Sequence, residues 1–440
     1  MLRHVRAPQP ASLHPRGMVS MFRYFLLASL VGAAGSVCAE PLSFEAALRI
    51  AIQSSPDIAA QGAKVEAARA AAVSAGRLPD PKLALGVENL PVTGAEKWSL
   101  TRDFMTMRKV GVMQELPNGA RRQAQVSAAA ASIAKAEAER HLTILSVRRD
   151  AALAWLDRYY LERQGGLFDE LEHENQLFAR GVQARFAGGG GMPVDLVAPG
   201  QEAADIADRR DELTAEIAKS TAVLKRLVGA VADEPLTGEP PDLTLDSQHL
   251  REHVHEHPDL AVFVPMTEMA QAAVHEAEAA KRPDWGVELS YGHRGAEFSD
   301  MISLQFTIDL PLFPSTRQDP QIQARRQDLT RVETEREAML RDHTQELEAD
   351  LAEYAVVTRQ LARLRETHLP LAREKVDYQF ASYRGGKADL TAVIAARREL
   401  IDLRLREIEL ESKRAIASAK LYYFYGPGAQ EPFSSKEVVR

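Results

Sequence analysis

The chain has 440 residues, of which 45% are hydrophobic and 26% are charged, so it is long enough to bury a substantial core. Its net charge of -8 and its pI near 5.9 argue against a nucleic-acid-binding protein, which normally carries a basic face. Glycine and proline contents are ordinary, which argues against a low-complexity or disordered chain.

Residues 1–39 are predicted to be a secretory signal peptide. Arg23 precedes an apolar run from Phe25 to Ala34, and Val37 and Ala39 satisfy the small-residue rule for cleavage after Ala39. The run is shorter than the roughly 20 residues that a membrane-spanning helix needs. Three alternatives remain open: a buried N-terminal helix, a true start at Met18 or Met21, and lipidation of Cys38, the sole cysteine.

The rest of the chain is predicted to contain one unit twice, over residues 40–240 and 241–426, followed by a tail over 427–440. Ser55-Pro56-Asp57-Ile58-Ala59 recurs as His257-Pro258-Asp259-Leu260-Ala261. Leu116 and Leu310 lie 194 residues apart, and so do Asp195 and Asp389. Landmarks that keep one offset over such a length indicate a duplication.

Each unit is predicted to contain a helix, two strands and a long helical hairpin. From Asn118 to Met192 there is no proline, and the stretch is rich in strong helix formers. A helix of about 70 residues would measure about 100 Å. Pro370 is expected to kink its counterpart in the second unit. The expected ranges are helices at about 43–76 and 247–281, strands at about 83–90, 104–116, 285–293 and 302–313, and hairpins at 118–229 and 318–425.

The strands alternate between apolar and polar residues. Trp285, Val287, Leu289 and Tyr291, for example, are separated by glycine, glutamate and serine, so one face is apolar and the other polar. The pattern fits either a half-buried sheet over a soluble core or a membrane barrel with a polar lumen. The signal peptide and the aromatic residues near strand ends favour the barrel: Trp285, Tyr291, Phe306 and Phe313.

Four strands cannot close a barrel, because the smallest membrane barrels have about eight. Open sheet edges in lipid would leave backbone groups unpaired at a cost of several kcal/mol each. If the strands enter a membrane, several copies of the chain must therefore assemble.

The hairpin turns are marked by glycines, Gly188 to Gly191 in the first unit and Gly385-Gly386 in the second. Asp195 and Asp389 follow these turns, where each returning helix needs an N-cap. A phosphate-binding loop is disfavoured because no Gly-Lys-Ser/Thr follows the glycines.

The assembled pattern resembles the TolC-like outer membrane factor (outer membrane efflux protein) family, from about Leu42 to Gly426. The resemblance rests on the order and doubling of several short motifs. They are Pro56-Asp57, Pro258-Asp259, Gln114-Glu115-Leu116-Pro117-Asn118-Gly119, Leu310-Pro311-Leu312-Phe313, Leu369-Pro370, Tyr383-x-x-Gly386-x-x-Asp389-Leu390, Ala395-Ala396-Arg397-Arg398-Glu399-Leu400 and Ala417-x-x-x-Leu421-Tyr422-x-x-x-Gly426.

The resemblance implies a mainly α fold with β strands and assembly as a homotrimer. Three chains would form a 12-strand outer-membrane β-barrel, continued by a long periplasmic α-helical barrel. The duct would be passive, and its partners would be a periplasmic adaptor (membrane fusion protein) and an inner-membrane efflux pump. By the same resemblance, the turns 186–196 and 383–391 would face the adaptor. The candidate gate or tip residues are Asp195, Asp389, Tyr383, Arg384, Gly386 and Lys387.

Within the family, the chain resembles the heavy-metal efflux branch through Leu78-Pro79-Asp80-Pro81, Glu88-Asn89-Leu90-Pro91 and Met105-Thr106-Met107. Metal cations are therefore the expected substrates. Met105, Met107 and Met113, and the histidines His253, His255 and His257, would suit soft or borderline metal ions. Packing in a strand and a solvated helix face are the more common roles of such residues, so we assign no metal-binding residue.

Other functions also remain open. The same family includes exit ducts for drugs, organic solutes and secreted proteins, and a periplasmic coiled-coil scaffold is the alternative of another class. The sequence carries none of the common nucleophile, zinc-protease or nucleotide-binding motifs, so we expect no enzyme, no catalytic residues and no cofactor.

Overall fold

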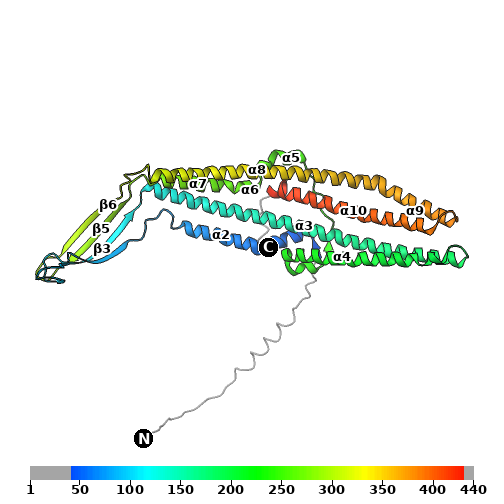
Figure 1. Ribbon diagram of the computed structural model, residues 1–440, viewed down its shortest axis with the longest axis horizontal. Helices are drawn as coiled ribbons and strands as arrows, with labels where there is room; N and C mark the ends of the chain where they lie inside the picture. The colour runs from blue at the N-terminus through cyan, green and yellow to red at the C-terminus, as the bar shows by residue number, and fades with distance from the viewer. Residues whose placement is uncertain (1–40, 431–440) are drawn as a thin grey trace, which may run out of the picture. The chain divides into compact units, whose positions relative to one another are not determined.

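The computed structural model describes residues 41–430, which are mostly helical and include one four-stranded sheet (Figure 1). Residues 42–430 belong to one compact unit. The predicted signal peptide, its cleavage point after Ala39, Cys38, and residues 431–440 of the predicted tail lie outside the described residues. Among residues 41–430, every helix is too short or too polar to cross a membrane.

The first segment of each predicted unit is broken into shorter helices. Where the sequence predicted one helix over 43–76, the structure has α1 (Phe44–Ser54) and α2 (Pro56–Ala72). The break occurs because Ser55 is extended and caps α2, its Oγ accepting a hydrogen bond from the Ile58 N–H at 3.3 Å. The predicted helix 247–281 divides likewise into α5 (Ser247–His253), η3 (Val254–Glu256), α6 (Pro258–Ala261) and α7 (Phe263–Ala279).

The sheet contains β2 (Lys82–Glu88), β3 (Met107–Leu116), β5 (Trp285–His293) and β6 (Met301–Ile308), in that order and antiparallel throughout. The pairing of β3 with β5 joins the two predicted units. The strand expected from residue 104 begins three residues later, because the Asp103 carboxylate accepts hydrogen bonds from the Met105 and Thr106 N–H groups and holds a turn.

The two faces of this sheet differ sharply in polarity. Leu85 pairs with Val110, Val112 with Leu289, and Leu289 with Leu304, so these side chains share one face. The apolar face is exposed among the described residues, with Ile302 75% exposed. On the opposite face the Lys109 ammonium lies 3.0 Å from carboxylate oxygens of both Glu88 and Glu288.

Helix α3 (Gly119–Ala187) runs unbroken for 69 residues, close to the predicted length. The chain returns through the 3-10 turn η1 (Pro193–Leu196) and α4 (Ala198–Val228). The second long helix comprises α8 (Gln318–Arg363), the π-turn η4 (Leu364–His368) and α9 (Leu369–Arg384), and returns as α10 (Leu390–Phe424). The π-turn ends two residues before Pro370, which has no N–H for the regular helical hydrogen bond. It confirms the predicted local break. Short elements complete the chain: β1 (Leu42–Ser43), η2 (Gly229–Asp233), β4 (Leu236–Thr237) and α11 (Pro427–Gln430).

The largest buried cluster lies midway along α3, around Trp155, which is 0% exposed. Phe44 meets the indole edge-on at 5.4 Å between ring centroids, and the indole N–H donates to the Leu42 carbonyl at 3.1 Å. Because β1 pairs in parallel with β4, the start of the first unit is held beside its end. Figure 1 shows the strands at one end of the long helices and the hairpin turns at the other.

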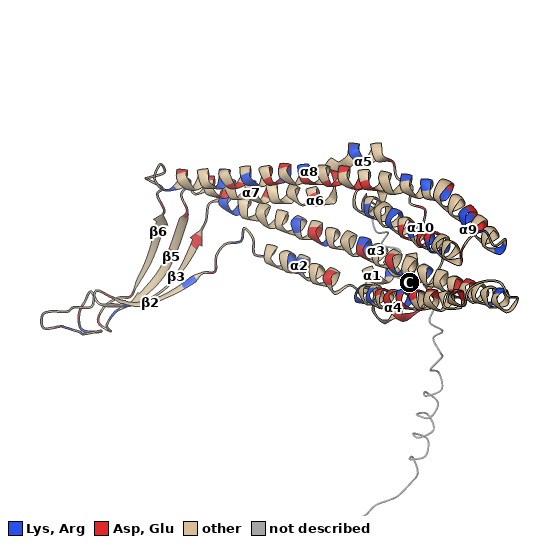
Figure 2. Ribbon diagram, turned by 45° about the vertical axis from the view of Figure 1, so that its right-hand side comes forward, with Lys and Arg blue, Asp and Glu red and all other residues tan. Residues whose placement is uncertain are grey.

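Charged residues are distributed differently on the helices and on the strands. Figure 2 shows Lys, Arg, Asp and Glu spread along the helices, whereas the strands carry few of them. The helices therefore present a surface suited to water, whereas the exposed apolar face of the sheet is not suited to water.

Candidate functional site

The first hairpin turn is shaped by its glycines. Gly188 caps α3, its N–H donating to the Ala184 carbonyl at 3.1 Å. Gly189 and Gly191 have φ values of 78° and 101°, a region that favours glycine. The chain then enters η1, where the Asp195 carboxylate accepts a hydrogen bond from the Met192 N–H at 2.9 Å.

The second turn is shorter and more open. Gly386 has a φ of 71° and no neighbour within reach of an added Cβ, so this predicted site residue acts through its backbone. Lys387 is exposed, and its backbone N–H donates to the Ser382 carbonyl at 2.9 Å. Arg384 ends α9 and is also exposed.

The two predicted gate aspartates are not equivalent, and the prediction that both are N-caps is wrong for Asp195. Asp195 is buried inside η1, and Val197 occupies the N-cap position of α4. Pro193 starts this extra 3-10 turn and displaces the helix start. Asp389 does hold the N-cap position of α10, but its carboxylate is exposed and makes no capping hydrogen bond.

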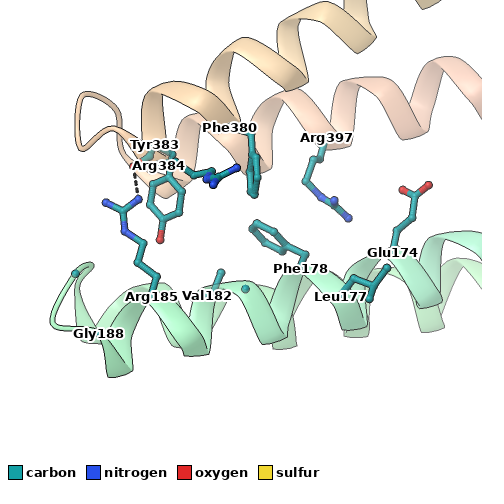
Figure 3. A pocket seen from close by; sticks show the side chains of 12 residues that line it. Glu174, Leu177, Phe178, Val182, Arg185, Gly188, Phe380, Tyr383, Arg384 and Arg397 are labelled. Atoms are coloured by element: carbon teal, nitrogen blue, oxygen red, sulfur yellow. Dashed lines mark hydrogen bonds between the residues drawn. The ribbon is translucent and has the colours of Figure 1, made fainter.

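The turns are joined by a contact between α3 and α9 (Figure 3). The Arg185 guanidinium stacks over the Tyr383 ring, 3.8 Å from its centroid, and also donates to the Tyr383 carbonyl. Such a cation–π contact contributes about 0.5–2 kcal/mol. A Cβ built on Gly191 would lie 3.1 Å from the Asp195 carboxylate, 3.8 Å from the Tyr383 hydroxyl and 3.9 Å from Arg185 Nε, so these three side chains converge on Gly191. Burial raises the pKa of the Tyr383 phenol, and nearby Arg185 partly opposes this effect.

A cavity of about 830 Å³ lies between the hairpins beside this contact. Phe178, Val182 and Phe380 give it apolar walls. Its charged lining consists of three arginines and one glutamate: Arg185, Arg384, Arg397 and Glu174. The cavity is therefore basic within one chain.

Beside the cavity, ion pairs join α4 to α10. The buried Glu202 lies 3.4 Å from the partly buried Arg397, which also lies 4.7 Å from the Phe178 ring centroid. The exposed Arg209 and Asp402 lie 2.8 Å apart. These contacts link the two returning helices near their N-terminal ends.

The sequence analysis found Tyr383 and Asp195 but missed their partner Arg185. Its signal was modest: a basic residue in the last turn of a helix, where it interacts favourably with the helix dipole. The structure does not bring Asp389, Arg384 or Lys387 into the Arg185–Tyr383–Asp195 contact. Among the predicted metal-binding methionines, Met107 and Met113 pack over Gly292 and Gly286 of β5, filling the space that those glycines leave.

Comparison with known proteins places this geometry in context. Residues 250–426 match the model of the outer membrane efflux protein family. The match runs from within α5 to just beyond α10. No curated protein matches the chain in sequence.

Solved structures of similar fold include three that cover most of the chain. CusC, whose crystal structures concern folding and transmembrane channel formation, has a TM-score of 0.73 at 16% identity, over 87% of this chain and 92% of CusC. A membrane protein from Pseudomonas aeruginosa has a TM-score of 0.76 at 16% identity, over 90% and 92%. The open state of the Neisseria gonorrhoeae MtrE outer membrane channel has a TM-score of 0.69 at 15% identity, over 88% and 89%.

Proposed function

Because residues 250–426 match the model of the outer membrane efflux protein family and the described chain has the fold of solved outer membrane channels, we propose that it is the outer-membrane channel of an efflux system. The protein would be a passive exit duct rather than an enzyme, located in the outer membrane with its helices in the periplasm.

The two-faced sheet carries this proposal. One face exposes leucine, isoleucine, valine and phenylalanine side chains, while the other holds the Lys109 ion pairs. In water the exposed face would be a large apolar patch, which a soluble protein normally covers. Against lipid the same face is favourable, and the charged face then lines a wet lumen.

The need for several copies follows from the sheet edges, and the number three follows from the family resemblance. Among the described residues, β2 and β6 each pair on one side only, so both outer edges of the sheet are open. Lipid cannot satisfy these backbone groups, whereas another copy of the chain can. We propose a homotrimer in which three sheets form a 12-strand barrel and the long helices form a helical barrel below it.

The partners and the substrate are proposed from the family resemblance. A periplasmic adaptor and an inner-membrane pump are the proposed partners, because the resemblance to the outer membrane factor family implies them. Heavy-metal cations are the proposed substrates, supported by the sequence motifs of that branch. Export of drugs, organic solutes or proteins by the same duct is the alternative, and the exposed apolar sheet argues against a wholly soluble scaffold.

Deletion of the gene separates these substrates. We expect the deletion strain to become sensitive to particular metal salts, and expression of the chain to restore resistance. Sensitivity to organic compounds with unchanged metal tolerance would reassign the substrate and leave the duct intact.

We further propose that the contact of Arg185, Tyr383 and Asp195 restrains the tips in the resting state. Arg185→Ala removes both the stacking and the bond to the Tyr383 carbonyl, so single-channel conductance in planar bilayers should rise. Arg180→Ala is the matched control, since that exposed arginine of the same helix lies outside the contact. Equal conductance of Arg185→Ala and wild type would show that this contact does not restrain the tips.

The two candidate gate aspartates, Asp195 and Asp389, can be tested in the same bilayer experiment. Asp389→Ala and Asp195→Ala should each lower the cation selectivity of the open pore. Unchanged selectivity in both variants would exclude these aspartates as its source.

A further inference from the structure

Two histidines and a carboxylate converge far from the tips, where α6 packs against α8. His257 is the N-cap of α6, Asp259 lies in its first turn, and His343 comes from α8. One potential ligand atom from each residue lies within 4.8 Å of the other two. Both histidines are only 5% exposed. Of the three histidines that the sequence suggested for metals, only His257 enters this cluster; His255 is exposed and His253 partly so.

The separations are close to those of a coordination shell. The His343 Nε2 lies 3.1 Å from the Asp259 Oδ2, and the His257 Nδ1 lies 3.8 Å from the same oxygen. Two ligands at about 2.1 Å from one metal ion are about 3.4 Å apart in a tetrahedral site. Small rotations of the two rings would bring all three atoms to that spacing.

The buried ring nitrogens lack adequate partners within the described residues. Neither nitrogen of His343 makes a hydrogen bond of acceptable geometry, despite the short distance to Asp259. A buried polar group without a partner costs about 1–3 kcal/mol. A bound cation would use the nitrogen that faces Asp259 and remove that cost.

His257 contributes a second imidazole to the cluster. Its Nδ1 accepts a hydrogen bond from the Asp259 N–H at 3.2 Å, so this nitrogen carries a lone pair and no proton. A metal ion bound at this nitrogen would replace that hydrogen bond. Its Nε2 makes no hydrogen bond of acceptable geometry within the described residues.

Aromatic packing alone explains the cluster less well. The His257 ring lies 4.1 Å from His343 and 4.4 Å from Phe424 between centroids, so it does pack among aromatic rings. Packing, however, does not explain a carboxylate and two unsatisfied imidazoles in one place. A cavity of about 320 Å³, lined by His257, Asp259 and Arg149 among others, reaches the cluster and gives room for a water molecule as a fourth ligand.

We propose that His257, Asp259 and His343 form a binding site for a divalent transition-metal ion such as Zn²⁺. Two imidazoles and one carboxylate suit zinc and related borderline ions. The ion would link α6 to α8, at the level where the second unit begins, and so has a structural role. This inference is independent of the proposed transport function, since the site is enclosed by the helices of one chain.

The sequence offers a matched variant for the test. Ser55 holds the same position before Pro56-Asp57 that His257 holds before Pro258-Asp259, and it caps α2. His257→Ser should therefore preserve the helix cap while removing a ligand, because serine is a preferred N-cap residue. His343→Gln removes the second imidazole, and the double variant His253→Ser/His255→Ser tests the more exposed histidines.

The experiment titrates the chelator-stripped, full-length protein in detergent with Zn²⁺ by calorimetry and with Co²⁺ by visible absorption. We expect one ion per chain, a Co²⁺ spectrum of nitrogen and oxygen ligation, and a rise in melting temperature with metal. His257→Ser and His343→Gln should bind at least about 10–100-fold more weakly, the loss that even an outer-shell partner causes. The His253→Ser/His255→Ser variant should bind like wild type.

Absence of stoichiometric binding would overturn the proposal, and so would binding that only the His253→Ser/His255→Ser variant loses. Circular dichroism of each metal-free variant separates a lost ligand from a lost fold. If His257→Ser melts with wild type in the absence of metal and no longer gains stability from Zn²⁺, the site is established. If it still gains the same stability, the site is excluded.

Discussion

The sheet and the middle of the long helices use apolar residues in opposite ways. Around Trp155 the apolar side chains of α1, α3 and α4 are buried against one another, as in a soluble protein. On the sheet, Ile302, Leu304 and Phe306 are exposed among the described residues, and the charges of Lys109, Glu88 and Glu288 are held together on the other face. One region therefore satisfies its apolar surface within the chain, while the other requires lipid and neighbouring copies.

Trp155→Ala should have the largest effect, because it empties a fully buried site and removes the hydrogen bond to Leu42. We expect the free energy of unfolding to fall by about 3–5 kcal/mol, measured by denaturant titration of the helical circular-dichroism signal in detergent. Phe306→Ala is the control, since Phe306 is exposed on the sheet and its loss should cost less than about 0.5 kcal/mol in the single chain. Similar losses in both variants would contradict the contrast.

Leu304→Arg tests which face of the sheet meets lipid. The charge would face lipid, and near the bilayer midplane it should cost about 2–4 kcal/mol per chain. Gln305→Arg places the same charge on the opposite face, where the Lys109 ion pairs already lie, and should be tolerated far better. The fraction of protein that enters lipid vesicles measures the difference, and equal insertion of both variants would refute the assignment of faces.

Smaller effects are expected along the returning helices. Glu202→Ala removes a buried carboxylate, leaves the partly buried Arg397 without this partner, and should cost about 1–3 kcal/mol. Asp205→Ala removes the exposed pair with Arg398 and should cost at most about 1 kcal/mol. Thermal melting of the two variants ranks them, and a larger loss for Asp205→Ala would show that burial does not control these pairs.

Much of the fold could be predicted because its signals are local. A proline-free stretch from Asn118 predicts α3, and period-two alternation predicts β5. The breaks at Ser55 and His257 were missed, although each of these residues precedes a proline, whose ring disfavours the helical conformation of the residue before it. The predicted length of the strand ending at 313 was wrong for a related reason: β6 ends at Ile308, and Pro311 cannot donate to a ladder.

The sites were less predictable because they depend on contacts between distant segments. Arg185 and Tyr383 are 198 residues apart, and only the packing of α3 against α9 brings them together. His343 has no neighbouring motif that marks it, yet it completes the cluster with His257 and Asp259. The expectation that Asp195 and Asp389 are equivalent failed because Pro193 inserts a 3-10 turn in the first hairpin alone.

The central claim is that one chain contributes only part of the pore, and the native mass of the detergent-extracted protein tests it most directly. The account predicts a single species with three times the mass of one chain, stable while the sheet edges are paired between copies. A stable, folded monomer as the only species would contradict it, because both open edges of the sheet would then lack the partners on which the proposed barrel depends.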